Sequence, residues 1–416
     1  MIQLQEHDII EGVDSQNKRF ENLKLVSWGR PQEGQPWGYY ASFKIGAEWI
    51  DSHEALVVTT KRGMESIDFL SMFMTCFSSN LAIESFSKIY SINAEHPAIN
   101  APSLKGVVSP LIVLHFLGVV SRIKTLKKGY VHRNENLKKV KGRINILKNE
   151  RSNVAVKRFD RIYCIYDEYS VDIPENRLLK KALLFSQRLF LRIGEHHHSY
   201  NTVWHMLTKS FAMFENVSCE VDIRDVRQMK EHKLYKDYAE AIRLAKLILS
   251  HFDYNINKVS ESDNKIVPFV LDMSLLYEHY VYGLLYEAYN NEVTYQYHGR
   301  TGAPDFLYCA NGFKAILDTK YIPKYERGSL DLNVVRQLSG YGRDLKILKH
   351  LGFDDITEDS PTPSVPCVII YPKESDRTEN PFLGKKLSTL CKNNVHKLSQ
   401  FYKISIPIPI VDIEIK

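Results

Sequence analysis

The stretch PDFLYCANGFKAILDTK, residues 304–320, holds two aspartates on either side of a short turn. Two runs of strand-forming residues flank Asn311-Gly312. An Asn-Gly pair in that setting is a strong signal for a β-hairpin with a two-residue turn, in which both turn residues take positive φ. Such a turn places Asp305 directly opposite Asp318. Opposed residues share one face of a sheet, with Cβ atoms about 4.5–5.5 Å apart, and like charges there are destabilising. We therefore expect a compensating positive charge beside the two carboxylates.

Two candidates can supply that charge. Lys320 lies two residues beyond Asp318 and therefore on the same face of the strand. The other candidate is Mg²⁺, which takes one or two carboxylates and completes its shell with water and substrate phosphate. A bound metal can polarise a phosphoryl oxygen and generate a nucleophile from its own water, while Lys320 can orient that water or offset transition-state charge. The pattern predicts a phosphodiester-cleaving site, and the alternative is a structural hairpin closed by a salt bridge.

The segments around the hairpin predict a mixed sheet with helices packed against it. A helical pattern covers residues 271–291, a strand pattern follows at 293–298, a second helix at 333–351 and a buried strand at 367–372. The expected order is helix, three strands, helix, strand. One face of the hairpin is expected to face the core with Phe306, Tyr308, Phe313, Ala315 and Leu317, and the other carries the carboxylates beside Leu307 and Ile316.

This arrangement resembles the PD-(D/E)XK nuclease superfamily. The motif reads Pro304-Asp305, then twelve intervening residues, then Asp318-Thr319-Lys320. The resemblance implies catalytic roles for Asp305, Asp318 and Lys320, with the carbonyl of Thr319 completing the shell of a Mg²⁺ ion, for which Mn²⁺ can substitute.

The same resemblance implies further site residues on the two helices. The acidic residue often found on the preceding helix would be Glu278, although Glu287 lies on the same helix and leaves that choice open. Gln337 and Tyr341 match the Gln-xxx-Tyr feature of some branches, and their i, i+4 spacing puts them on one helical face.

A closer resemblance appears in the middle of the chain. GYVHRNENLKKVKGRINILKN at 129–149 and YCIYDEYSVDIPENRLLKKAL at 163–183 are similar to segments of McrC-family proteins, and the similarity runs to about residue 371. McrC proteins are nuclease subunits of modification-dependent restriction systems and act with McrB, an AAA+ NTPase that recognises DNA.

The McrC resemblance implies a DNA endonuclease subunit in a hetero-oligomer with a McrB-type AAA+ GTPase or ATPase. Its substrate would be double-stranded DNA, either modified or unmodified. Two alternatives remain: a stand-alone repair nuclease with the same core, and a non-catalytic adaptor that binds nucleic acid or a partner. The sequence contains no GxxxxGK[ST], so the chain itself is not expected to hydrolyse nucleotides.

Length and patterning predict a multi-domain α+β protein. At 416 residues the chain is too long for one ordinary core. We expect a β-rich N-terminal module with helices at 1–128, which is a candidate for partner binding. A basic and helical middle domain is expected at 129–260 and the α/β nuclease domain at 261–416. The polar stretch 257–265 is the best linker candidate.

Positive charge is concentrated in one segment. From Arg122 to Arg161 there are fourteen Lys or Arg against three Asp or Glu, a net charge of +11, whereas the whole chain carries +6. Such a cluster is typical of contact with a polyanion or an acidic partner, and the plainer interpretation is a solvated basic face. We expect DNA or partner contact at Lys138, Lys139, Lys141 and Arg143.

Other features favour a cytoplasmic protein without a membrane segment. The N-terminus lacks a signal-peptide pattern, and the longest apolar run, 111–120, is too short to cross a bilayer. The six cysteines are scattered singly and are expected to be reduced thiols. We expect a solvated loop at the three histidines 196–198, and a structural or interface role for Asp167, Glu168, Asn176 and Arg177.

Overall fold

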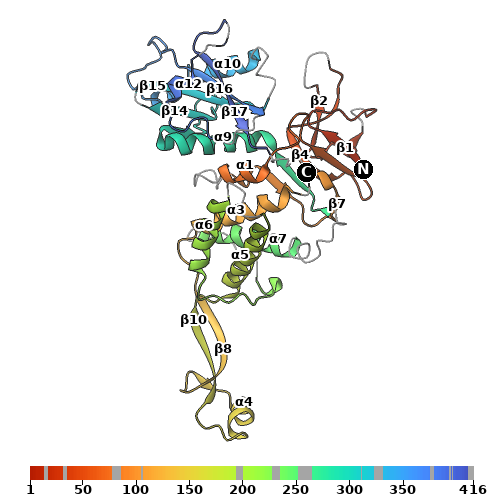
Figure 1. The fold of residues 1–416 in the computed structure, drawn as a ribbon, viewed down its shortest axis with the longest axis vertical. Helices are drawn as coiled ribbons and strands as arrows, with labels where there is room; N and C mark the ends of the chain where they lie inside the picture. The colour runs from red at the N-terminus through yellow and green to blue at the C-terminus, as the bar shows by residue number, and fades with distance from the viewer. Residues whose placement is uncertain are drawn as a thin grey trace. The chain divides into compact units, whose positions relative to one another are not determined.

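The chain forms two compact units, seen in Figure 1. The computed structural model describes all residues except 14–16, 31–34, 77–85, 105, 194–199, 227–234, 252–264, 311, 323–330, 375–378, 393–394, 396 and 411–416. Unit 1 joins Met1–Leu111 with Ser260–Lys416, and unit 2 is Ile112–Val259. The chain passes from unit 1 to unit 2 between Leu111 and Ile112 and returns to unit 1 after Val259.

The N-terminal part of unit 1 is built on a five-stranded sheet of order β1-β5-β4-β12-β6. The strands are β1 (Ile2–Gln5), β4 (Lys44–Trp49), β5 (Ala55–Thr59), β6 (Tyr90–Ile92) and β12 (Phe269–Asp272). Strand β1 runs parallel to β5, and the other pairs are antiparallel. Two smaller pairs accompany the sheet: β2 (Val26–Gly29) with β3 (Gly38–Ala41), and β7 (Ile99–Asn100) with β11 (Lys265–Ile266).

Strand β12 was not anticipated in this sheet. It comes from beyond residue 261, the expected start of the nuclease domain, yet it pairs with β4 on one side and β6 on the other. The β-rich module is therefore completed by the segment that leads directly into helix α9 (Met273–Tyr289).

The C-terminal part of unit 1 is a second five-stranded sheet of order β13-β14-β15-β16-β17. The strands are β13 (Val293–Tyr295), β14 (Phe306–Ala310), β15 (Phe313–Thr319), β16 (Cys367–Glu374) and β17 (Phe401–Ile408). The first three are antiparallel, and β15, β16 and β17 run parallel. The predicted order of helix, three strands, helix and strand is confirmed, and β17 is an additional strand.

Helices cover both faces of this sheet. Helix α9 packs on one face, where Tyr282 stacks on Phe306 with ring centroids 5.9 Å apart. Helices α10 (Leu332–Tyr341) and α11 (Leu345–His350) pack on the other, where Leu307 and Ile316 are buried in a cluster with Leu338. The face that carries the carboxylates is thus a second core face. Helix α1 (Phe69–Cys76) packs against α9, and α12 (Leu387–Leu390) precedes β17.

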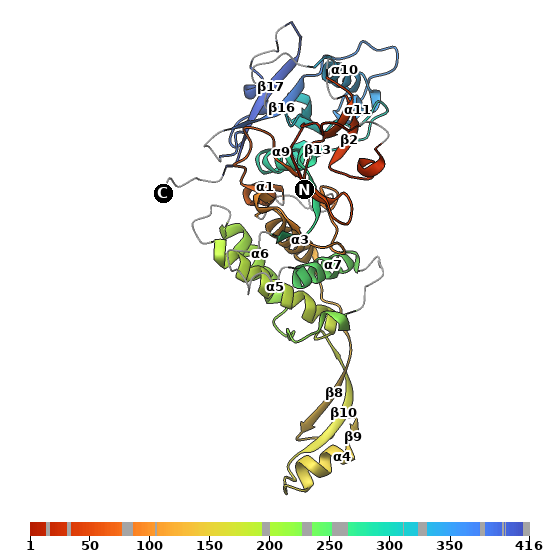
Figure 2. The same ribbon diagram turned by 90° about the vertical axis from the view of Figure 1, so that its right-hand side faces the viewer.

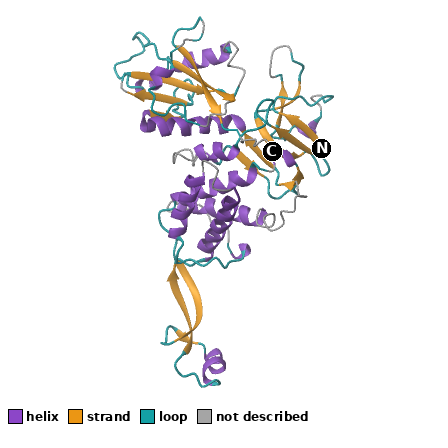
Figure 3. Cartoon of the chain, viewed as in Figure 1, coloured by secondary structure: helices purple, strands orange, loops and turns teal. Residues whose placement is uncertain are grey.

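Unit 2 combines helices with a long two-stranded arm. Helix α5 (Pro174–Ile193) packs against α6 (Tyr200–Met213) and α7 (Lys236–His251). Figures 2 and 3 show strands β8 (Gly129–Leu137) and β10 (Ile162–Ser170) projecting from these helices as a ribbon. The outer end of the arm carries the short strand β9 (Arg143–Ile144) and helix α4 (Ile146–Asn149).

Helix α3 (Val108–Arg122) contains the apolar run noted in the sequence. The stretch Pro102–Arg122 is longer than that run and, by length and composition alone, would reach across a membrane. Its most apolar window is 76% buried inside the protein, which is also how core helices of soluble proteins behave.

Candidate active site

The hairpin has the register that its Asn-Gly turn predicts. Strand β14 pairs with β15 so that Leu307 faces Ile316 and Ala310 faces Phe313, and the last pair, Phe306 with Leu317, lies next to Asp305 and Asp318. Gly312 has a φ of 83°. Asn311 lies outside the described residues. The expected register is confirmed.

Asp305 is held by the strand opposite it. Its Oδ2 accepts the backbone N–H of Thr319 at 2.6 Å and the Thr319 hydroxyl at 2.5 Å. Burial raises the pKa of Asp305, and the two Thr319 hydrogen bonds and the charge of Lys320 oppose that rise. Thr319 therefore orients the carboxylate of Asp305, and it is also the residue that follows Asp318 in the chain.

Asp318 faces Lys320, as residues two apart in a strand should. Lys320 Nζ lies 2.5 Å from Asp318 Oδ2, and the Asp318 side chain is buried. Lys320 is therefore the positive charge that compensates the Asp318 carboxylate in this structure. Burial and the charge of Asp305 raise the pKa of Asp318 to about 6, against the opposing effect of Lys320. Two neighbouring carboxylates carry more negative charge than one ammonium offsets, which fits a site that takes a further cation.

Glu278 joins the two aspartates from helix α9. It is buried, and Gln296 Nε2 donates a hydrogen bond of 2.7 Å to its Oε1. Burial, followed by the charge of Asp305, raises the pKa of Glu278 to about 7. Glu287 instead accepts a hydrogen bond of 2.9 Å from Asn380 Nδ2. Of the two candidates on this helix, the structure brings Glu278 to the carboxylate pair.

The donor set fits a cation that uses few protein ligands. Among the described residues, no group of three or more His, Cys, Asp or Glu side chains could hold one ion, so Glu278 lies near the two aspartates without forming a three-residue metal site with them. A cation between Asp305 and Asp318 would therefore draw its other ligands from the Thr319 carbonyl, water and substrate. Such a mixed shell is typical of Mg²⁺.

Gln337 and Tyr341 lie at the loop that leads into the motif. Gln337 Nε2 donates to the Tyr341 hydroxyl at 2.9 Å, and that hydroxyl donates to the carbonyl of Ala303 at 3.3 Å. Tyr341 also packs against Gly302, where a Cβ would come within 3.1 Å of its ring. These contacts position the chain just before Pro304.

Asp344 holds the same loop and was not predicted as a site residue. Its Oδ2 accepts the backbone N–H groups of Arg300 and Thr301 at 2.5 and 2.7 Å, and the Thr301 hydroxyl at 3.0 Å. Its Oδ1 caps helix α11 by accepting from the N–H of Lys346 at 2.9 Å. The sequence places Asp344 directly before an apolar helical run, which is typical of a helix cap. It contains no sign that the same side chain holds the loop at 300–301.

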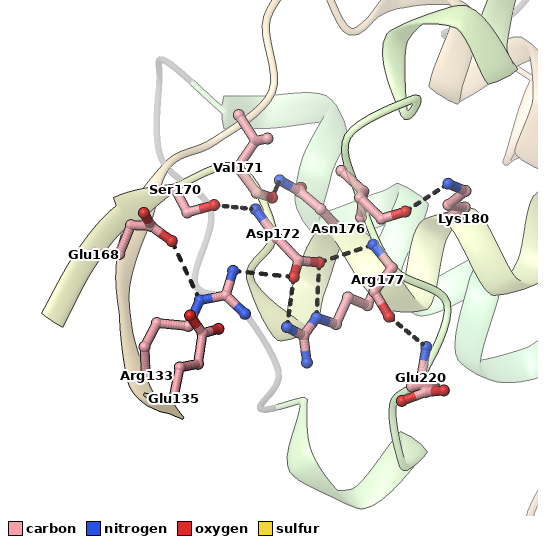
Figure 4. A network of polar contacts seen from close by, with 12 residues as sticks. Arg133, Glu135, Glu168, Ser170, Val171, Asp172, Asn176, Arg177, Lys180 and Glu220 are labelled. Carbon is pink, nitrogen blue, oxygen red and sulfur yellow. Dashed lines mark hydrogen bonds and ion pairs between the residues drawn. The ribbon is translucent and has the colours of Figure 1, made fainter. Parts of the chain in front are cut away.

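Glu168, Asn176 and Arg177 of the middle region all make hydrogen bonds near the base of the arm. Asp172, at the root of the arm, accepts both ends of the Arg177 guanidinium at 2.8 and 2.6 Å and also contacts Arg133 at 3.4 Å. Arg133 in turn donates to Glu168 at 3.2 Å. Figure 4 shows these side chains converging; Asn176 donates to the Val171 carbonyl at 2.6 Å. We call Arg133, Asp172 and Arg177 the arm-root network.

The predicted basic contact residues lie on the outer part of the arm, and all four are exposed: Lys138, Lys139, Lys141 and Arg143. Lys141 also has a local role, because its Nζ lies 3.1 Å from Glu168 and 4.0 Å from the ring centroid of Tyr166. Asp167 pairs with His132 at 3.0 Å on the same arm. The histidines at 196–198 lie outside the described residues.

A protein-family model described as McrBC 5-methylcytosine restriction system component matches residues 104–338 of the chain. The chain belongs to this McrBC family. The matched range includes the arm, the arm-root network and the hairpin with Asp305, Asp318 and Lys320. The family expected from the sequence is confirmed.

Two solved structures are similar to this McrBC-family chain. One is a half-complex from a tetradecameric assembly of Thermococcus gammatolerans McrB AAA+ hexamers with bound McrC, at 15% identity and a TM-score of 0.39, covering 98% of this chain and 94% of that one. The other is the Thermococcus gammatolerans McrBC complex, at 14% identity and a TM-score of 0.30, covering 68% and 86%. A search of curated proteins found no match.

Proposed function

We propose that this McrBC-family protein is a Mg²⁺-dependent DNA endonuclease subunit with a PD-(D/E)XK core, which acts in the cytoplasm with an AAA+ NTPase. The observation that carries the proposal is the geometry at the end of β15. There Asp318 is buried, Asp305 is half-buried and is held by Thr319, and Lys320 Nζ lies 2.5 Å from Asp318 Oδ2. A purely structural ion pair has no need of a second carboxylate beside the first.

Each residue has a distinct chemical role in this proposal. Asp305 and Asp318, with the Thr319 carbonyl, would hold Mg²⁺. When bound, the ion supplies Lewis-acid polarisation of the phosphate and a water of lowered pKa. The hydrolysis adds water across a P–O bond and leaves a phosphate monoester and a hydroxyl.

Lys320 and Glu278 would have different roles beside the carboxylate pair. The Lys320 ammonium, oriented by Asp318, can offset the negative charge that develops on the phosphoryl oxygens. Glu278, with a pKa raised to about 7 by burial and by Asp305, can accept or release a proton near neutral pH. Its hydrogen bond from Gln296 fixes one oxygen and leaves the carboxyl group oriented.

The proposed partner follows from what this chain lacks and from what its structural neighbours contain. The sequence has no phosphate-binding loop, and the similar Thermococcus gammatolerans structure contains McrB AAA+ hexamers with bound McrC. We propose that a McrB-type AAA+ NTPase recognises double-stranded DNA, modified or unmodified, and licenses cutting. The exposed basic residues of the arm supply a surface for the assembly or its DNA, and the six free thiols suit a reducing compartment.

The deciding experiment compares the isolated chain with the assembly. With Mg²⁺ alone the chain should cut plasmid DNA poorly or not at all, and with an NTPase partner, hydrolysable nucleotide and suitable DNA it should cut. Single changes of Asp305, Asp318 or Lys320 to Ala should abolish cleavage and leave folding and partner binding intact. Cleavage that persists in the Asp318→Ala assembly would refute the nuclease assignment. Efficient cutting by the isolated chain, unchanged by partner or nucleotide, would indicate a stand-alone repair nuclease.

A further inference from the structure

The N-terminal sheet reaches the end of the catalytic strand through Lys61. This residue follows β5, and its Nζ donates a hydrogen bond of 2.7 Å to the backbone carbonyl of Tyr321. The same ammonium lies 3.2 Å from the centroid of the Tyr321 ring. Tyr321 is the residue directly after Lys320, so Lys61 holds the backbone at the point where the catalytic lysine leaves β15.

Glu6 fixes both members of that contact. Its Oε2 accepts the backbone N–H of Lys61 at 3.0 Å and the Tyr321 hydroxyl at 3.4 Å. Glu6 follows β1, which is paired with β5, so the two strand ends present the acid and the lysine together. Burial raises the pKa of Glu6 to about 7 and lowers that of Lys61 to about 8. Polar groups this desolvated are stable only with their partners in place.

A second connection runs from the same sheet to the helix that carries Glu278. Strand β12 pairs with β4 and β6 and ends at Asp272, whose side chain caps α9 by accepting from the N–H of Ser274 at 3.1 Å. The first N–H of that helix, on Met273, donates to the carbonyl of Phe43 at 2.8 Å. One sheet thus anchors both the strand end with Lys320 and the helix with Glu278.

We propose that the N-terminal sheet positions the catalytic lysine, with Lys61 as the positioning residue that holds the Tyr321 carbonyl and so aims Lys320 at Asp318. This inference rests on the proposed nuclease function. Lys320 is tied by its N–H to the carbonyl of Ile370 at 2.9 Å, and its own carbonyl accepts from Ile322 at 2.7 Å. The direction of its side chain is therefore set by a few backbone contacts around residue 321.

The arrangement gives the first hundred residues a role in regulation. Catalytic geometry tolerates little error, because a displacement of about 1 Å can cost about a hundredfold in rate. A partner that shifts the N-terminal sheet would move Lys320 through Lys61, and Glu278 through β12. The sheet is thereby a route by which assembly can switch the site.

The test uses the full chain and its assembly with Lys61→Met, which removes the ammonium and keeps the aliphatic stem. Amide hydrogen exchange of the isolated protein should accelerate at residues 320–322 and stay unchanged in distant strands. Cleavage by the assembly should fall by about tenfold or more at saturating Mg²⁺ and DNA, while the Mg²⁺ concentration for half-maximal rate changes by less than about twofold. Lys61→Arg should recover part of the rate.

The matched control is Arg62→Met, which removes an exposed cation one residue away. It should leave exchange and cleavage at wild-type values, and an equal loss in this variant would overturn the inference. Wild-type exchange and cleavage in folded Lys61→Met would do the same. Should Lys61→Met not fold, the same exchange and cleavage measurements on Lys61→Gln, together with hydrogen exchange of Lys61→Arg, test the inference instead.

The exchange measurement also separates this inference from the nuclease assignment. A wild-type assembly that never cleaves DNA would refute the nuclease, whereas the exchange rates at residues 320–322 would still show whether Lys61 holds the strand end. Cleavage that is intact in the wild type but insensitive to Lys61 would keep the nuclease and overturn the positioning role.

Discussion

At the scale of single residues, the close approach of Asp305 and Asp318 lowers the stability of the folded protein. The folded protein holds the proton of Asp318 to about pH 6, above the ordinary value of 3.8, because of burial and the charge of Asp305. Folded molecules therefore bind more protons than unfolded ones between about pH 4 and pH 6, so this residue makes stability fall as pH rises through that window. Above about pH 6 Asp318 is ionised in both states, and its full destabilising effect on the folded protein remains.

Asp318→Asn should accordingly stabilise the metal-free protein at pH 8. The gain should be about 1–3 kcal/mol in the free energy of unfolding, and it should disappear as the pH approaches 4. Urea unfolding at the two pH values in the presence of a chelator measures it. The exposed residue Asp354 supplies a control, because Asp354→Asn should change stability little at either pH. Equal stability of Asp318→Asn and wild type at pH 8 would contradict the prediction.

Mg²⁺ should reverse this cost in the wild type. A cation between Asp305 and Asp318 neutralises the repulsion and binds only the folded state, so millimolar Mg²⁺ should raise the unfolding midpoint at pH 8. Asp305→Asn, which removes one of the two charged ligands, should lose most of that response. Thermal unfolding with and without chelator provides the measurement. An identical Mg²⁺ response in the variant would show that the ion binds elsewhere.

At the scale of elements, the arm depends on its root. A two-stranded ribbon is marginally stable by itself. Here cross-strand ion pairs and the arm-root network tie it to helix α5, through Asp172 and Arg177. The signal in the sequence was the Asp-Glu and Asn-Arg pair, and the structure explains it as a clamp that fixes the base of the arm.

Asp172→Asn should therefore destabilise unit 2 by about 2 kcal/mol, because it leaves two guanidinium groups without their shared carboxylate. Limited proteolysis should show earlier cleavage near the arm root. Asp167→Asn, at an exposed pair with His132 farther along the arm, should cost about 0.5 kcal/mol or less. Equal effects of the two substitutions would show that the root contacts have no special role.

Elements set by local pattern could be predicted, and elements set by distant pairing could not. The hairpin register followed from Asn311-Gly312, and the helix–strand order followed from periodicity. Strand β12 completes a sheet whose other members lie far earlier in the chain, and no local pattern reports that. The same holds for the site: Asp305, Asp318 and Lys320 follow from a single hairpin, whereas the contact of Lys61 with Tyr321 joins residues 260 positions apart.

At the scale of the whole molecule, the positive charge is concentrated in a segment that does not contain the carboxylate pair. The chain carries +6, and the segment that includes the arm carries +11, so the remainder sums to −5. Asp305 and Asp318 belong to unit 1 and the arm to unit 2, as the compact units divide the chain. A change at the outer part of the arm should therefore alter assembly or DNA contact and leave the metal site as it was.

Charge reversal of Lys138, Lys139 and Arg143 to Glu tests that separation. Lys141 is kept because it pairs with Glu168 within the arm. The triple variant should bind its NTPase partner or DNA at least about tenfold more weakly at low salt, with the difference shrinking as ionic strength rises, because charge complementarity is screened by salt. Its Mg²⁺-dependent shift in unfolding midpoint should match the wild type.

A matched triple reversal isolates position from net charge. Lys124, Arg188 and Lys209 are exposed basic residues of unit 2 outside the arm, and changing them to Glu alters the net charge by the same amount. This variant should bind within about threefold of wild type, because its changes lie off the proposed contact surface. Equal weakening by the two sets would reduce the arm to a solvated basic face whose only effect is long-range charge. Loss of the Mg²⁺ response in the arm variant alone would show that the arm and the metal site are coupled rather than separate.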